Sequence, residues 1–241
     1  GTGGTTGGTG GTTGGTGGTG GSSSGTTLAP GEIAIVGVQT DTPGSFTFVT
    51  FVDLAPGTQI NFTDDGWLDV PASGGNPAVL DFRRNGGNFS EDAITIQFDA
   101  QVSAGSVFLV DGLTVPPSAN VTVSVPSYSN GTSGLTGLSA SGDQVLAYQG
   151  TDTNPSFLFG VSCAKLGFDG TDSSTTSYIP AALNPSGGPA YFINVSNDDD
   201  CDYTGLRSGS AFSAYNALIT DTANWTTSNT AFTNGLTTTN F

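Results

Sequence analysis

The stretch that decides the fold reads PGEIAIVGVQTDTPGSFTFVTFVDLAPGTQINFTDDGW from Pro30 to Trp67. Short runs rich in Val, Ile, Phe and Thr alternate there with turn sequences such as DTPG and APG. β-branched and aromatic residues at alternating positions favour strands, whereas Gly, Pro and Asp favour the turns between them. The same pattern continues along the chain. It predicts nine strands, at Glu32–Val38, Ser45–Val52, Thr58–Phe62, Ala93–Phe98, Ser106–Val110, Asn120–Val125, Asp143–Tyr148, Ser156–Val161 and Ala190–Val195.

Nine short strands at this spacing are typical of a β-sandwich, so we expect an all-β fold with a jelly-roll-like topology. One stretch differs, because Ser208–Leu218 spaces Phe212, Tyr215 and Leu218 as a helix does. We expect a short amphipathic helix there that covers one open end of the sandwich. The last residues, Ala231–Phe241, are expected either to add an edge strand or to offer one to a neighbouring molecule.

The first 21 residues contain only 13 Gly and 8 Thr, and the sequence TTGGTGG occurs at Thr5–Gly11 and again at Thr12–Gly18. Such a segment buries almost no apolar surface, and glycine loses much backbone freedom on ordering, so it cannot order alone. The repeat favours an extended arm held by another copy of the protein or stiffened by sugars. The alternative is a flexible Gly-rich linker. We therefore divide the chain into an arm or linker, residues 1–25, and a secreted β-sandwich domain, residues 26–241.

The arm supplies the predicted assembly residues, which are Gly1, Thr5, Thr12, Thr19 and Gly21. The predicted sites of O-linked sugar are Thr5, Thr6, Thr9, Thr12 and Thr13. Among the six N-x-[ST] sequons, Asn130 is the predicted N-linked acceptor, because it lies in a Ser/Gly-rich stretch that should form a surface loop.

The chain is strongly acidic, with 18 Asp and 2 Glu against four basic residues and a formal net charge of −16. Nucleic acids and anionic membranes both require basic patches, so neither is an expected partner. The chain has no histidine, the commonest general base, and no nucleophile signature. We therefore expect no enzymatic activity. No apolar run reaches the length of a membrane span, so we expect no membrane insertion.

The two cysteines, Cys163 and Cys201, form an even count in a chain of extracellular composition. This favours one disulfide that closes a loop of about 38 residues. A pair of buried free thiols is the alternative.

Acidic residues cluster near the second cysteine, at Asp198, Asp199, Asp200 and Asp202. Calcium takes six to eight oxygen ligands, which adjacent aspartates and backbone carbonyls of a loop can supply. The spacing does not match an EF-hand. A calcium site and a solvated acidic turn are both open interpretations of this cluster, and no other cofactor is expected.

Four blocks of sequence carry a resemblance to a known group. They are the stretch Pro30–Trp67, GDQVLAYQG at Gly142–Gly150, PSFLFGV at Pro155–Val161 and TANWTTSNT at Thr222–Thr230. In this order they resemble a group of poorly characterised secreted bacterial proteins with a β-rich domain. The resemblance implies the fold and a secreted location, and it does not include the arm. No catalytic activity is established for the group, so the resemblance implies no catalytic residues.

Two functions are open. The first is a structural subunit of an extracellular filament, a helical homopolymer joined through the arm. If a strand is exchanged between subunits, Thr27–Val38 or Ala231–Phe241 is expected, because strand donation needs apolar side chains. The second is a surface-anchored adhesin or carbohydrate-binding module in which Trp67 or Trp225 stacks on sugar.

Overall fold

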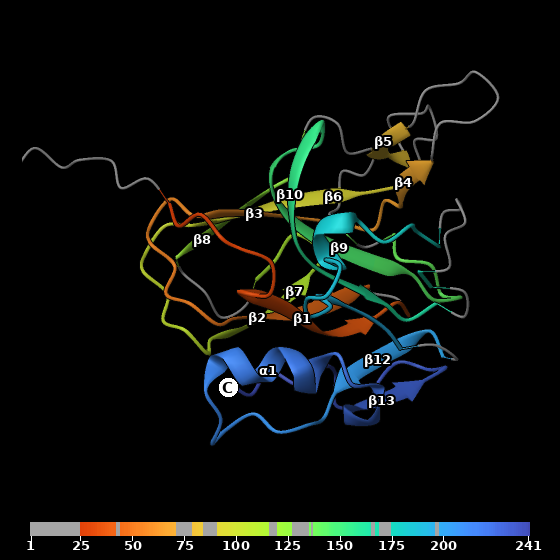
Figure 1. The fold of residues 1–241 in the computed structure, drawn as a ribbon. Coiled ribbons are helices and arrows are strands. Elements are labelled where there is room, and N and C mark those ends of the chain that lie inside the picture. Colours follow the sequence, from red (N-terminus) through yellow and green to blue (C-terminus); the bar gives the residue numbers. More distant parts are fainter. Residues whose placement is uncertain are drawn as a thin grey trace, which may run out of the picture.

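The computed structural model describes residues 25–41, 44–70, 79–83, 91–115, 120–126, 135, 137–164, 167–168, 175–195 and 198–241. Two β-sheets face each other across a common hydrophobic core, and one short helix lies outside them (Figure 1). The predicted all-β sandwich is confirmed.

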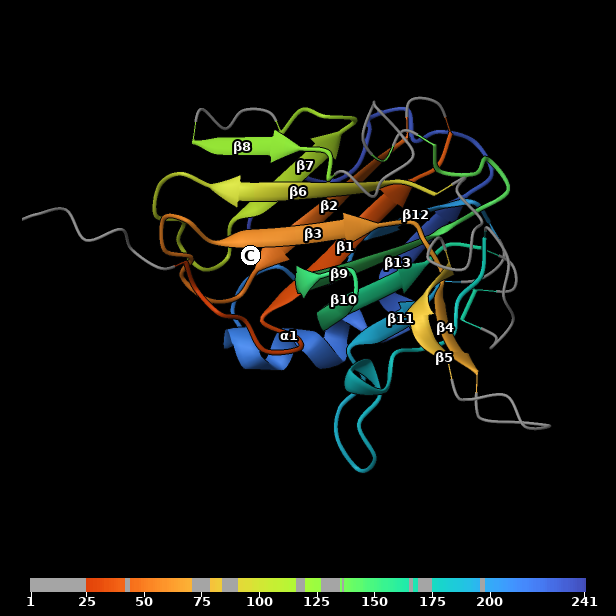
Figure 2. The ribbon, with the colours of Figure 1, turned by 90° about the horizontal axis from the view of Figure 1, so that it is seen from above.

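The first sheet has five strands in the order β13-β12-β1-β2-β7. These are β13 (Trp225–Ser228), β12 (Asp200–Tyr203), β1 (Ile33–Gln39), β2 (Ser45–Thr50) and β7 (Val107–Asp111). The second sheet has six strands in the order β11-β10-β9-β3-β6-β8 (Figure 2). These are β11 (Phe192–Asn194), β10 (Asn154–Ser162), β9 (Gln144–Thr151), β3 (Gln59–Thr63), β6 (Ala93–Phe98) and β8 (Val121–Ser124). A separate hairpin consists of β4 (Trp67–Val70) and β5 (Val79–Phe82). Only the short β11 pairs in parallel among the described strands.

All nine predicted strands are present, with ends that differ by a few residues. Four strands were not predicted: the two of the hairpin, β12 and β13. β12 has the sequence DCDY, and aspartate disfavours strands, so propensity alone argues against it. It nevertheless lies between β1 and β13, and all four of its residues are buried.

Aromatic side chains fill the space between the sheets. Phe46 and Phe48 of β2 reach Phe62 of β3, with ring centroids 4.9 and 4.8 Å apart. Phe108 of β7 contacts Phe48 and also Phe98 of β6, each at 5.2 Å between centroids. The alternation of SFTFVT therefore places its phenylalanines on the inner face, as the pattern predicts.

A second cluster lies under the β4–β5 hairpin. Trp67 and Phe82 of the hairpin pack edge-on at 5.2 Å between centroids, and Phe82 also contacts Tyr148 and Phe157 of the six-stranded sheet. The hairpin thus covers part of that sheet with its own small core.

The C-terminal residues are bound to their own domain. The backbone N–H of Phe241 donates to the Gly105 carbonyl at 3.0 Å, and Asn240 Oδ1 accepts from Val107 N at 2.9 Å. No strand forms in 229–241. The expectation that Ala231–Phe241 adds an edge strand is therefore wrong, because these contacts are not those of a paired strand. Donation of this segment to a neighbouring molecule stays a prediction.

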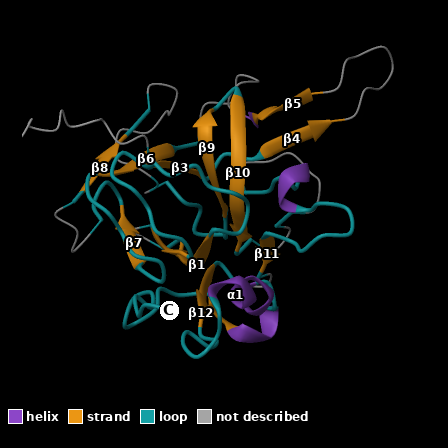
Figure 3. Ribbon diagram, turned by 60° about the vertical axis from the view of Figure 1, so that its left-hand side comes forward, coloured by secondary structure: helices purple, strands orange, loops and turns teal. Residues whose placement is uncertain are grey.

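The predicted helix exists as α1 (Phe212–Ile219), and Tyr215 and Ile219 are its buried residues. It starts four residues later than expected, and Gly209 before it has a φ of +82°, which is incompatible with a helix. The helix lies on the side of the five-stranded sheet away from the other sheet (Figures 1 and 3). The expectation that it covers an open end is therefore wrong. Short 3₁₀ turns occur at Ala181–Leu183 and Thr222–Asn224.

The disulfide between Cys163 and Cys201 is confirmed, with Cα atoms 5.9 Å apart. Cys163 directly follows β10 and Cys201 lies in β12, so the bond joins the two sheets. Both cysteines are fully buried. A disulfide of this kind fits an extracellular protein. No helix in the described part of the chain has the length and apolar character needed to cross a membrane.

Candidate functional site

The base of the N-terminal arm is fixed to the sandwich. The chain before Leu28 contains only Gly, Thr and Ser, so Leu28 is its first apolar side chain. That side chain is 6% exposed and belongs to the main core. A Leu buried to this degree contributes about 1.5–3 kcal/mol by removing apolar surface from water. Leu28 therefore attaches the arm to the domain.

A single glutamine, Gln149 of β9, takes the place of a neighbouring strand beside the arm base. Its Oε1 accepts a hydrogen bond from Leu28 N at 2.8 Å, and its Nε2 donates to the Thr26 carbonyl at 3.0 Å. The same Nε2 also donates to the Gln59 carbonyl at 2.9 Å. One side-chain amide thus satisfies both a donor and an acceptor of the incoming backbone, as a paired strand would.

A second set of contacts, from the turn that precedes β3, also holds Thr26. Its N–H donates to Thr58 Oγ1 at 2.8 Å, and its own hydroxyl accepts from Ala55 N at 2.8 Å. At Gly25 an added Cβ would lie 2.3 Å from Thr58 Cα, so only glycine lets the two backbones approach this closely. These contacts therefore fix the backbone of residues 25–28 in one conformation on the domain.

The outer edge of this segment is open. Thr26 and Leu28 direct their backbone groups at the domain, and alternate residues of an extended chain point to opposite sides. Thr27, between them, is exposed, and within the described residues neither its N–H nor its carbonyl has a hydrogen-bond partner. A polar groove of about 360 Å³ adjoins it. The groove is lined by Gly25, Thr26, Thr27, Leu28, Gly57, Thr58, Gln59, Gln149, Gly150 and Ser156.

The four aspartates of the predicted calcium site do not share one set of partners. Asp200 Oδ1 accepts from Thr40 N at 2.6 Å, and Asp202 accepts from Thr237 N at 3.2 Å. Asp198 accepts from Thr227 Oγ1 and Asn229 Nδ2.

Asp199 Oδ1 and Asp200 Oδ2 are buried without a hydrogen-bond partner among the described residues. Burial, the largest cause, raises the pKa of Asp200 and of Asp202. In the described ranges no three His, Cys, Asp or Glu side chains are arranged to hold a metal ion. Calcium therefore stays a prediction, and the expectation of a solvated turn is wrong for the three buried residues, Asp199, Asp200 and Asp202.

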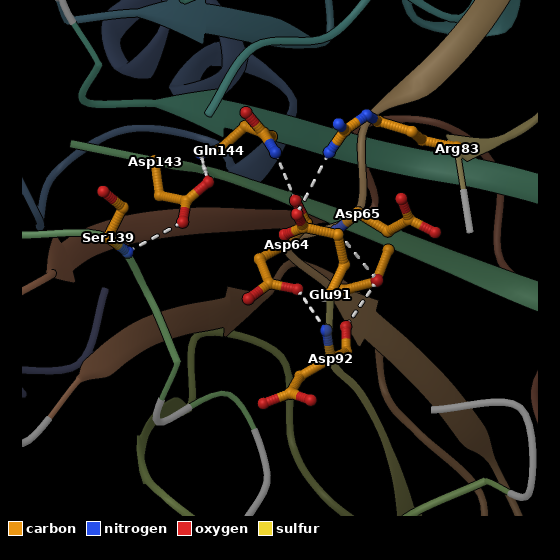
Figure 4. Close-up of polar contacts among 9 residues, drawn as sticks. Asp64, Asp65, Arg83, Glu91, Asp92, Ser139, Asp143 and Gln144 are labelled. Carbon is orange, nitrogen blue, oxygen red and sulfur yellow. Dashed lines mark hydrogen bonds and ion pairs between the residues drawn. The ribbon is translucent and has the colours of Figure 1, made fainter. Parts of the chain in front are cut away.

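A second acidic group gathers at one end of the six-stranded sheet (Figure 4). Asp64 Oδ1 accepts from Asp92 N at 2.7 Å, and Gln144 Nε2 donates to the Asp64 carbonyl. Arg83 Nη1 lies 3.3 Å from Glu91 Oε1. Asp143 accepts from Ser139 N and from Gln144 N, each at 2.9 Å. The buried acidic members are Asp64, Asp65, Glu91, Asp92 and Asp143.

Burial raises the pKa of Asp64 well above its ordinary value, and the charges of Asp143 and Glu91 raise it further. Burial likewise raises the pKa of Asp143, against the lowering effect of the Ser139 and Gln144 N–H groups. Carboxyls crowded in this way hold protons more firmly than exposed ones. The group can therefore hold protons, but its residues line neither the groove beside Thr27 nor the hollows at α1 and at Trp67.

The sequence pattern did not bring Asp64 and Asp65 together with Glu91, Asp92 and Asp143. A signal for them exists in the chain. Asp64 directly follows β3, whereas Asp92 and Asp143 directly precede β6 and β9. Because these two strands flank β3 and run antiparallel to it, their starts meet its end.

Two further hollows are more apolar. One of about 440 Å³ lies between α1 and the start of β1, where Phe51, Tyr191 and Phe212 line it. The other, of about 310 Å³, is lined by Trp67, Leu80 and Phe157 among others. Trp67 and Trp225 are each only 8% exposed, and the indole N–H of Trp225 donates to the Ile219 carbonyl at 2.7 Å. Neither tryptophan presents an open ring face for a sugar.

The predicted assembly residues Gly1, Thr5, Thr12, Thr19 and Gly21 lie outside the described residues, and so do the glycosylation candidates Thr6, Thr9, Thr13 and Asn130. Comparison with known protein families, with curated proteins and with solved structures gives no match. The resemblance to secreted bacterial proteins therefore stays a prediction.

Proposed function

We propose that this protein is a structural subunit of an extracellular filament, in which the Gly/Thr-rich arm of each copy bridges to the next. The observation that carries the proposal is the fixed base of the arm. A mere tether needs no dedicated attachment, whereas here the burial of Leu28 and hydrogen bonds to Gln149 and Thr58 hold the backbone.

The way in which the chain passes from the arm into the domain suits a subunit that bears tension along its arm. Five residues after Leu28, at Ile33, the chain enters β1, which is hydrogen-bonded to β12 on one side and to β2 on the other. Tension along β1 acts across many of these bonds at once, because ladder bonds stand perpendicular to the strands. This central position also argues against exchange of Thr27–Val38 between subunits, since its removal would open the sheet.

The cross-sheet disulfide adds to the same argument. It fixes β12, the neighbour of β1, to the end of β10 in the other sheet. A pull on β1 is thus shared between the two sheets. The disulfide also supports an extracellular setting, where such bonds persist.

Charge supports assembly through the arm in particular. The chain carries a formal net charge of −16, but its first 24 residues contain no charged side chain. Contact between two acidic bodies costs Coulomb energy, whereas a neutral arm approaches a second body without that cost.

Electron microscopy of the full-length protein tests the proposal. We expect filaments from the full chain and dispersed particles after deletion of residues 1–21. A matched control replaces residues 5–18 with a Gly/Ser sequence of equal length, which retains a tether but removes the repeat. Circular dichroism establishes that each variant is folded. Dispersed full-length protein, or filaments without the arm, would refute the proposal and favour the adhesin alternative.

A further inference from the structure

We infer that the polar groove beside Thr27 is the docking site for the Gly/Thr arm of a second copy of this chain. The inference rests on the proposed filament function and names the surface through which it operates. The arm of the second copy would lie along Thr27 and pair with it through backbone hydrogen bonds.

The first support is the open backbone edge. Thr27 offers one N–H and one carbonyl that have no partner among the described residues, next to a segment whose other edge is occupied by Gln149. An exposed edge of this kind accepts an additional strand. The arm lacks apolar side chains, but pairing through backbone hydrogen bonds does not require them.

The second support is the chemistry of the groove. Its ten lining residues carry no charge, although the chain as a whole is strongly acidic. Gln59 and Ser156 are exposed and present further donors and acceptors to an extended backbone. Gly57 and Gly150 border the groove without side chains that would block a close approach. An uncharged, side-chain-poor chain such as the arm matches this surface, whereas the acidic loops of a second body do not.

The third support is the length of the arm. A globular body of the size of residues 26–241 is roughly 44 Å across. At about 3.3 Å per residue, the 13 residues from Thr12 to the residue before Gly25 span ~43 Å. The repeat Thr5–Gly11 would then reach the groove of an adjacent copy, while Thr12–Gly18 lies in the span between the two bodies.

Cross-linking between two separately made full-length variants tests the inference. Ser156→Cys places a thiol in the groove, and Thr9→Cys places one in the arm of a second, isotope-labelled preparation. After mixing and treatment with a short bismaleimide, we expect heterodimers joined between positions 156 and 9. The matched controls are Thr19→Cys in the arm and Ser124→Cys, an exposed strand residue at the far edge of the same sheet.

A second variant tests the backbone pairing. Thr27→Pro removes the outward N–H without removing any hydrogen bond within the described chain, and Thr27→Ala retains that N–H. We expect at least a tenfold rise in the critical concentration for polymerisation with proline and little change with alanine.

The outcomes separate the two proposals. Filaments that form without the 156–9 cross-link, or that cross-link equally well to position 124, overturn this inference and leave the filament function standing. Equal polymerisation of Thr27→Pro and Thr27→Ala also overturns it. If the full-length protein forms no filaments and no heterodimers, the proposed function fails and this inference fails with it.

Discussion

Replacement of Gln149 by alanine should release the base of the arm without unfolding the sandwich. The substitution removes three hydrogen bonds: one accepted from Leu28 N, and two donated to the carbonyls of Thr26 and Gln59. At a net 0.5–1.5 kcal/mol per bond, the loss is about 3 kcal/mol if the segment stays in place. β1 keeps its pairing to β12 and β2, so the segment should open locally rather than carry β1 with it.

Hydrogen exchange at the Leu28 amide measures this directly, because among the described residues that N–H donates to Gln149. Of the three bonds, only those to Leu28 and Thr26 hold the arm base, so about 2 kcal/mol of the loss acts on local opening and the exchange rate should rise roughly 30-fold. Amides in the middle of β1 should exchange at nearly the wild-type rate, since local opening of residues 25–29 does not expose them. The control is Gln59→Ala, which removes an exposed side-chain contact to Gln97 and keeps the carbonyl that Gln149 binds.

Two results would refute the reasoning. Leu28 exchange in Gln149→Ala that stays within threefold of the wild-type rate would mean that Gln149 does not hold the arm base. A fall in global stability equal to the local effect would mean that the arm base and β1 open as one unit. The structural argument for a separately attached arm would then be lost.

Three further outcomes follow from the core. Burial raises the pKa values of Asp64 and Asp143, so the folded state holds protons that the unfolded state has released. The free energy of unfolding should therefore fall as pH rises above about 4, by up to about 1.4 kcal/mol per pH unit for each carboxyl. Urea titrations of Asp64→Asn and Asp143→Asn should show a weaker dependence of this free energy on pH than the wild type does. Replacing Cys163 and Cys201 with alanine opens a loop with a sequence separation of 38 and should lower the free energy of unfolding by about 3–4 kcal/mol. Urea denaturation measures this change, and an unchanged midpoint would contradict the prediction. Gly37→Ala would place a Cβ 2.7 Å from Thr47 Oγ1 and 2.9 Å from Asp202 Oδ1. We expect thermal unfolding to show that the folded state loses about 1–3 kcal/mol of stability. An unaltered melting temperature would show that the neighbouring side chains can move aside.

Alternation of apolar and polar residues was sufficient to predict the strands that the core depends on. In β2 the phenylalanines at every second position face the opposite sheet, so local pattern and tertiary packing agree. Prediction failed for β12, where two of four residues are aspartates. Its strand conformation is determined by pairing with β1 and β13 on either side and by the disulfide at Cys201. Local strand propensity does not include any of these tertiary contacts.

The candidate site was even less accessible to sequence reasoning. Gln149 lies 121 residues after Leu28 in the chain, and the predicted strand Asp143–Tyr148 stops just before it. Nothing about a glutamine after a strand distinguishes a structural amide from a solvated one. Only the fold brings β9 alongside the chain that enters β1, and the role of Gln149 follows from that placement.

One arrangement recurs in three places: a polar side chain forms hydrogen bonds that a neighbouring strand would otherwise form. Gln149 pairs with the backbone of Thr26 and Leu28, Asp200 accepts the N–H of Thr40 beyond the end of β1, and Asp202 accepts that of Thr237 in the C-terminal segment. A segment held in this way depends on a few side chains, whereas a ladder strand depends on many backbone bonds along its length. The arm base can therefore be loosened by one substitution while β1 keeps both of its neighbours. If the arm carries the contact between copies, assembly and domain stability are thus separable properties of this chain, and Gln149 is the residue at which to separate them.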